Sequence, residues 1–329
     1  MNDGTPFYAS RRAFIGASCI CVGSTMFGSL FPVRSAYADD LPRTDAPGYH
    51  SLSVGSLKVT VISDGQGPLP AMQLLQGRKD LIEQALRSQS LGNMVLTSHN
   101  AFVIDNGKKV ILVDAGGGSL IGPNFGKLRG NLSAAGYRPE QISEVLLTHL
   151  HADHHGGLMM GNQRAFPNAI VRVNRVDADF WLSPKERESA PEASKRGFDL
   201  AMGSLKPYLN AKKLEVFDGE TALGNGIIAR PAYGHTPGHT MYEVNSDGQQ
   251  MLLWGDIVHV AAVQFPHPDV TIGFDSEKDA ARVEHWRMFD ELAKSGQLVG
   301  GAHLPFPGIG RVRDTGGSGY VFDSAAVAT

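Results

Sequence analysis

Four side chains that commonly bind metal ions lie within six residues of one another. They are His149, His151, Asp153 and His154. Imidazole nitrogens and carboxylate oxygens suit Zn²⁺ or a similar divalent ion, and such an ion can activate water for hydrolysis at neutral pH. A solvated, histidine-rich loop that binds nothing is the alternative. The concentration of four metal-binding side chains in one short segment favours a metal site.

Apolar runs that end in turn-forming residues precede this segment and three later candidate ligands. The runs and the candidates that follow them are 145–147 before His149, 227–231 before His235, 251–255 before Asp256, and 299–302 before His303. Short apolar runs bounded by glycine and proline are typical of buried strands. A lone histidine after a strand is often structural, but four such cases in one chain favour ligands. The sequence therefore predicts that several strands deliver ligands at their carboxyl ends.

The remaining chain alternates between strand and helix patterns, which predicts an α/β fold. We expect strands over 58–65 and 169–173, a hairpin over 101–114 around Asn106-Gly107, helices over 80–88, 124–136 and 279–295, and a closing strand or loop over 308–323. Pro68 and Pro70 predict irregular structure from Gly67 to Met72. Residues 177–202 are polar and partly helical, and hold the aromatic residues Trp181 and Phe198.

The composition of the 329 residues is that of a soluble globular protein, with 42% hydrophobic and 19% charged residues. The formal net charge of −3 provides no basic field, so we expect no nucleic-acid binding. The sequence shows no internal repeat and no linker between domains.

The N-terminal residues 1–38 resemble a twin-arginine export signal that is cleaved before Asp39. Arg11 and Arg12 precede a weakly apolar, glycine-rich run, and Ala36-Tyr37-Ala38 supplies small residues at the cleavage site. A membrane anchor and a cytoplasmic tail are the alternatives, but the run is too short and polar to span a bilayer securely. We expect one domain over residues 39–329, a periplasmic or secreted location, and no stable membrane anchor after cleavage. Both cysteines lie in the signal, so the mature chain has no thiolate ligand.

The motif His-x-His-x-Asp-His at 149–154 resembles the signature of the metallo-β-lactamase superfamily. The resemblance implies an αβ/βα four-layer sandwich with a metal site at its edge and two divalent ions, with zinc the expected metal. It assigns His149, His151 and His235 to one ion, Asp153, His154 and His303 to the other, and Asp256 to a position between them. It makes His239 a supporting histidine and Asp114 a structural residue near the site. The implied reaction is hydrolysis by attack of a metal-bridging hydroxide.

Four further segments resemble the methyl parathion hydrolases and the related dihydrocoumarin-type lactonases: 178–183, 234–240, 260–265 and 304–310. This closer resemblance implies a substrate pocket formed by Leu74, Ile121, Trp181, Phe198, Ile272 and Phe274. Ile121 stands where methyl parathion hydrolases have an aromatic residue. Leu74, His259, Ile272 and Phe274 agree with the lactonases instead. We therefore expect a lactonase or arylesterase, with an organophosphorus phosphotriester hydrolase as the alternative.

Several assignments have a plainer alternative. Trp181 and Phe198 could anchor a flap rather than contact an aryl substrate. His259 could hydrogen-bond a substrate carbonyl or act on the leaving alkoxide, or it could simply pack beside the metal ligands. A non-catalytic metal-binding protein and a β-lactamase are the other classes, although no lysine or arginine is placed to bind the carboxylate of a β-lactam. The expected partner is a small-molecule substrate, and a homodimer is left open.

Overall fold

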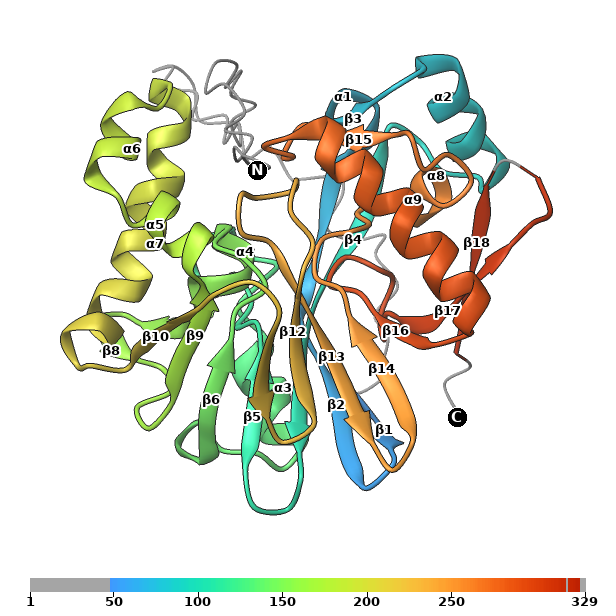
Figure 1. Ribbon diagram of the computed structural model, residues 1–329. Helices are drawn as coiled ribbons and strands as arrows, with labels where there is room; N and C mark the ends of the chain where they lie inside the picture. The colour runs from blue at the N-terminus through green and yellow to red at the C-terminus, as the bar shows by residue number, and fades with distance from the viewer. Residues whose placement is uncertain (1–47, 318, 326–329) are drawn as a thin grey trace, which may run out of the picture.

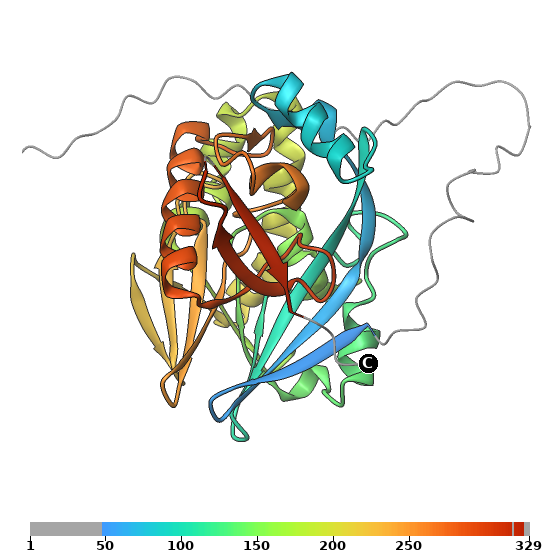
Figure 2. The same cartoon turned by 90° about the vertical axis from the view of Figure 1, so that its right-hand side faces the viewer.

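The computed structural model describes residues 48–317 and 319–325, and its layers are built on two seven-stranded sheets. The first sheet has the order β1-β2-β4-β5-β6-β9-β10, and the second has the order β11-β12-β13-β14-β16-β17-β18. The two sheets lie against each other, with helices on both outer faces (Figure 1, Figure 2). This confirms the predicted α/β four-layer sandwich. The proposed signal at 1–38 lies outside the described residues.

The strands of the first sheet are β1 (Tyr49–Val54), β2 (Leu57–Pro70), β4 (Met94–Asp105), β5 (Val110–Val113), β6 (Ile142–Leu146), β9 (Ile170–Asn174) and β10 (Leu214–Phe217). Those of the second are β11 (Thr221–Gly224), β12 (Ile227–Pro231), β13 (Thr240–Ser246), β14 (Gln249–Leu253), β16 (Leu298–Gly300), β17 (Ile309–Asp314) and β18 (Tyr320–Ser324). Two short pairs add β3 (Leu75–Gln76) with β15 (Thr271–Ile272), and β7 (Met159–Met160) with β8 (Gln163–Arg164).

The α-helices of the described residues are α1 (Ala71–Leu74), α2 (Lys79–Ser88), α3 (Leu128–Ala134), α4 (Ala152–His155), α5 (Arg175–Trp181), α6 (Pro184–Ser189), α7 (Glu192–Asn210), α8 (Ala261–Gln264) and α9 (Lys278–Ser295). None of these is long and apolar enough to cross a bilayer.

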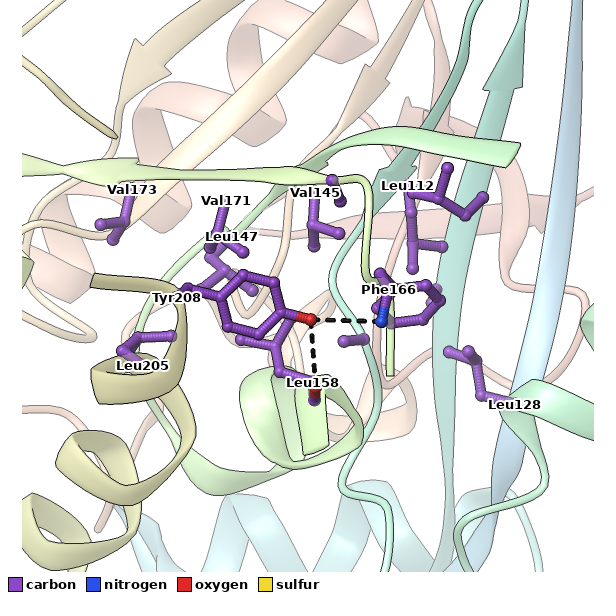
Figure 3. Close-up of a cluster of buried hydrophobic side chains, with 14 of the residues drawn as sticks. Leu112, Leu128, Val145, Leu147, Leu158, Phe166, Val171, Val173, Leu205 and Tyr208 are labelled. Atoms are coloured by element: carbon purple, nitrogen blue, oxygen red, sulfur yellow. Dashed lines mark hydrogen bonds between the residues drawn. The ribbon is translucent and has the colours of Figure 1, made fainter. Parts of the chain in front are cut away.

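Three apolar layers follow from the alternation of side chains along the strands. Leu146 and its neighbours in the first sheet pack against the second sheet, while Val145 packs on the opposite side with α3 and α7. Figure 3 shows this outer cluster, in which the hydroxyl of Tyr208 donates to the carbonyl of Leu158 and accepts from the N–H of Phe166. α9 covers the outer face of the second sheet through Met288, Phe289 and Leu292.

The prediction of irregular structure from Gly67 to Met72 is wrong, because β2 continues to Pro70 and pairs with β4 through Gly67, Pro68, Leu69 and Pro70. β1 pairs with β2 only as far as Ile62, so the later part of β2 has one free edge. Proline lacks a backbone N–H and is tolerated at such an edge.

The helix expected over 124–136 is also shorter, since α3 begins at Leu128. Gly122 and Gly126 have φ values of 118° and 78°, which a right-handed helix does not allow. The helices expected over 80–88 and 279–295 are confirmed within one residue at each end. The hairpin around Asn106-Gly107 is confirmed, but its first strand, β4, begins at Met94 rather than at residue 101. The closing segment forms the hairpin β17–β18.

Candidate active site

The predicted ligands gather at one edge of the sandwich, where four strands end. The first group of histidines follows β6, His235 follows β12, Asp256 follows β14 and His303 follows β16. β6 belongs to the first sheet and the other three strands to the second. The prediction that strands deliver these side chains at their carboxyl ends is confirmed.

Two groups of potential ligands form there and share Asp256. The groups are His149, His151, His235 and Asp256, and Asp153, His154, His303 and Asp256, with the ligand atoms of each group within 4.8 Å of one another. Oδ2 of Asp256 lies 3.2 Å from Nε2 of His235 and 3.0 Å from Nε2 of His303. Oδ1 of the same carboxylate lies 3.1 Å from Nε2 of His154. All seven predicted ligands are thus brought together.

The residues fit divalent cations. Asp256 is buried among imidazoles, and an uncompensated buried carboxylate is costly. Its Oδ1 and Nε2 of His154 are both buried and make no hydrogen bond within the described chain. Burial alone would raise the pKa of Asp153 and Asp256, but the neighbouring imidazoles hold both well below the usual value, so both are ionised. Anionic oxygen and imidazole nitrogen form a donor set suited to zinc.

Four of the ligand histidines have their Nδ1 atoms engaged, so that Nε2 faces the centre. Their Nδ1 partners are the Thr148 hydroxyl for His149 at 3.1 Å, Asp114 for His154 at 2.8 Å, Asp275 for His235 at 2.8 Å, and the carbonyl of Ser98 for His303 at 3.0 Å. Such partners fix the tautomer and orientation of a metal-binding imidazole. His151 differs, because its Nδ1 lies 3.0 Å from Nε2 of both His149 and His235.

The ligand histidines differ in their charge states. Burial lowers the pKa of His149 and His151 well below the usual value, so these rings are neutral. Burial also opposes protonation of His235, but hydrogen bonds to Asp256 and Asp275 raise its pKa to about 9. The chain's own carboxylates therefore hold a proton on His235 that a metal ion at Nε2 would displace.

Asp114 supports the site, as the sequence predicted. Its carboxylate accepts hydrogen bonds from the backbone N–H of Thr148 at 2.8 Å and from the hydroxyl of Thr148 at 2.9 Å. It also accepts the hydrogen bond from Nδ1 of His154. Asp114 has a φ of 59°, in the left-handed region that aspartate tolerates better than most residues. Asp114 directly follows β5, and its carboxylate contacts the loop that carries the first ligands.

Asp177 joins two ligand loops and was missed by sequence reasoning. Its Oδ2 accepts from the N–H of Leu150 at 2.8 Å, and its Oδ1 accepts from the N–H of Gly238 at 2.7 Å. Burial raises the pKa of Asp177 to about 6. Asp177 lies in α5, in a segment rich in charged residues, and no sequence pattern distinguishes it from the other acidic residues there.

His239 belongs to neither ligand group and supports Asp256 instead. Its Nδ1 donates to the carbonyl of Ala232 at 3.1 Å, and its Nε2 accepts from the N–H of Asp256 at 3.0 Å. Burial lowers the pKa of His239 to about 3, which keeps Nε2 unprotonated as this contact requires. The structure thus supports the predicted division between His235 and His239.

His259 lies beside the centre without joining either group. Its Nε2 is 3.2 Å from Oδ2 of Asp256, and its ring stacks on His303 with 4.8 Å between centroids. Burial lowers the pKa of His259 to about 4, so the ring is neutral at neutral pH. Phe274 also lies near His259, with 6.0 Å between the ring centroids. His259 is therefore placed to offer an N–H rather than a positive charge.

The predicted pocket residues occupy different depths. Trp181 lies edge-on to His151 at 5.4 Å between centroids, and Phe198 packs behind Trp181 at 4.8 Å. Ile121 lies against the backbone of Gly117. Leu74 and Phe274 are half-buried in a cluster with Ile272. Phe198 and Ile272 expose almost no surface, so they would support other pocket residues rather than contact a substrate. The pocket role of all six residues stays a prediction.

The chain belongs to the metallo-β-lactamase superfamily, whose family model matches residues 94–315. A solved structure described as hydrolase AbOPH in the beta lactamase superfamily is 31% identical, covers 86% of this chain and 99% of that chain, and has a TM-score of 0.82. The dizinc quorum-quenching lactonase AidC, solved with the product N-hexanoyl-L-homoserine, shares the fold with a TM-score of 0.80 at 24% identity, covering 86% of this chain and 99% of that chain.

Curated relatives match a shorter stretch. An N-acyl homoserine lactonase of Bacillus sp. is 28% identical over 168 residues, which is 51% of this chain and 58% of the relative. The uncharacterized protein YobT of Bacillus subtilis is 25% identical over 158 residues, which is 48% of this chain and 60% of the relative. The chain thus spans less than two thirds of these relatives. The predicted superfamily is confirmed, and the closer resemblance to methyl parathion hydrolases stays a prediction.

Proposed function

We propose that this protein is a dinuclear metal-dependent hydrolase that opens lactones or aryl esters. The observation that carries the proposal is the pair of ligand groups that share Asp256 at the edge of the sandwich. When bound, two divalent ions supply a nucleophile from water at neutral pH and polarise the scissile carbonyl. Zinc is the ion that the donor set favours.

The residues around the ligand groups favour a flat, uncharged substrate. Trp181 stands beside His151 on one side, and Phe274 beside His259 on another. Aromatic walls bind apolar rings, and none of the six proposed pocket residues carries a charge. The neutral His259 can donate one hydrogen bond to a carbonyl or alkoxide oxygen. The similarity to proteins described as lactonases supports lactone opening as the reaction.

The deciding experiment compares kcat/KM for dihydrocoumarin and methyl parathion with the metal-reconstituted protein. We expect the lactone to be preferred by at least about tenfold, which corresponds to about 1.4 kcal/mol of transition-state stabilisation. Asp256→Ala is the control, and it should lose both full metal content and turnover. The reverse preference would establish the phosphotriester hydrolase, and full metal binding without turnover of either substrate would indicate a metal-binding protein.

We also propose that the chain is exported through the twin-arginine pathway and cut before Asp39. The paired arginines Arg11-Arg12 and the small residues at 36–38 support this proposal. Fractionation of expressing bacteria should recover a mature chain that begins at Asp39 outside the cytoplasm. Replacing both arginines by lysine should leave the full-length chain in the cytoplasm, and an unchanged distribution would refute the proposal.

A further inference from the structure

His99 lies beside the ligand groups although it belongs to neither. It sits in β4, and its Nδ1 is 3.5 Å from Oδ2 of Asp153. Its ring meets His303 edge-on at 4.7 Å between centroids. Nδ1 of His99 is buried and makes no hydrogen bond within the described chain, and 15% of the side chain remains exposed. A buried ring nitrogen without a partner that lies beside a ligand carboxylate calls for a physical explanation.

The strand that carries His99 is tied to the loop that carries His303. The carbonyl of Ser98 accepts from Nδ1 of His303 at 3.0 Å. The side-chain amide of Asn100 donates to the carbonyls of Gly301 and Leu304 at 3.1 and 2.8 Å. The two residues that flank His99 in β4 thus hold the loop of His303, and the side chain of His99 lies beside Asp153, a ligand from the loop after β6.

Phe125 also packs on the ring of His99, at 4.5 Å between centroids. Two glycines of β2 make room for Phe125. A Cβ on Gly67 would lie 2.4 Å from the Phe125 ring, and a Cβ on Gly65 would lie 2.2 Å from the carbonyl oxygen of Asn124. Any side chain at either position would displace the loop and its aromatic ring. The contacts with Phe125 and His303 therefore restrict the movement of the His99 ring.

Asp153 is the ligand of its group that most needs support. Its side chain is 20% exposed, whereas the side chains of His154, His303 and Asp256 are at most 4% exposed. Its Oδ2 lies 3.4 Å from Nε2 of both His154 and His303. An exposed carboxylate can rotate toward water, and this rotation would remove one ligand from the group.

We propose that His99 is a positioning residue for Asp153. The Nδ1–H of His99 holds the carboxylate of Asp153 toward His154 and His303. The distance of 3.5 Å becomes a hydrogen bond after a small change in a side-chain torsion. Outer hydrogen-bond partners of metal ligands typically change metal affinity by about 10- to 100-fold. His99 thereby sets the occupancy of the group formed with Asp153, while the group that contains His149, His151 and His235 depends on it much less.

The test is a stepwise Co²⁺ titration of the metal-free protein, followed by its visible absorption spectrum. His99→Val should weaken one of the two ions by about 10- to 100-fold and leave the other nearly unchanged. His99→Asn should restore much of the lost affinity, because its amide N–H lies near the position of Nδ1. Thr97→Val, two residues earlier in the same strand, is the matched control and should bind both ions as the wild type does. Phe125→Leu should weaken the same ion by a smaller factor.

The proposal would be overturned if His99→Val bound each of the two ions with the same affinity as the wild type. Equal weakening in His99→Val and His99→Asn would also overturn it, because the effect would then not depend on the N–H. The proposal rests on the two-ion site of the proposed function, but the titration needs no substrate. A wild type that binds both ions and hydrolyses neither test substrate would refute the hydrolase and leave the assignment of His99 intact.

Discussion

Nε2 of His239 accepts a 3.0 Å hydrogen bond from the backbone N–H of Asp256, so one buried histidine holds the main chain of the carboxylate that both ligand groups share. The ring of His239 spans from the carbonyl of Ala232 to this N–H. His239 thus connects the end of β12 to the loop after β14, and Asp256 cannot shift without breaking that connection.

Replacement of His239 by alanine should therefore destabilise the fold. It leaves the N–H of Asp256 buried without a partner, which costs about 1–3 kcal/mol, and it also opens a cavity. We expect a lower urea midpoint with an unchanged m-value in the metal-free protein. His50→Ala, in β1 and outside the site, is the control. A midpoint for His239→Ala equal to that of the control would contradict the supporting role.

Metal binding should release protons at neutral pH. His235 has a pKa of about 9 in the metal-free structure, so it is protonated at pH 7.5 and must lose that proton to bind an ion. In the metal-free protein, its contribution to stability is present below the unfolded pKa of about 6.5 and is lost as the pH rises through about 9. Calorimetric titration with Zn²⁺ in buffers of different ionisation enthalpy measures the release.

Asp275→Asn is the matched variant for this measurement. It removes the negative charge next to Nδ1 of His235, so this variant should release fewer protons per bound ion and should bind zinc more weakly. Identical proton release by the variant and the wild type would show that Asp275 does not set the charge of His235.

Asp177→Asn should loosen both ligand loops. The carboxylate accepts from two backbone N–H groups, and an amide offers one accepting oxygen and a competing donor. One buried N–H then loses its partner, at a cost of about 1–3 kcal/mol. We expect weaker zinc binding and a lower urea midpoint. Asp179→Asn in the same helix is the control, and equal effects of the two substitutions would remove the special role of Asp177.

Phe274 and His259 should together set the choice between lactone and phosphotriester. The ring of Phe274 lies 6.0 Å from that of His259 between centroids, and Nε2 of His259 lies 3.2 Å from Oδ2 of Asp256. Phe274→Leu combined with His259→Leu should raise the ratio of kcat/KM for methyl parathion to that for dihydrocoumarin. An unchanged ratio would show that these two residues do not determine the choice of substrate.

The sequence singled out the candidate ligands because they follow apolar runs typical of strands, and the resemblance to the superfamily supplied their division into two groups. In the structure these strands belong to two sheets whose carboxyl ends meet at one edge of the sandwich. The sequence did not predict Asp177, Asp275 or His99, since the site residues that they contact lie between 27 and 61 residues away and no local pattern relates them. Pro68 and Pro70 gave a wrong prediction because their effect depends on which edge of β2 is free, which only the sheet pairing determines.

The distribution of the ligands over the chain also constrains the order of folding. His149 follows a strand of the first sheet, and His303 follows β16 of the second, close to the end of the fold. A nascent chain that has not yet added β16 to its sheet lacks one ligand of the Asp153 group. High-affinity uptake of a full complement of ions is therefore a late event, and it reports that the two halves of the sandwich have closed on each other.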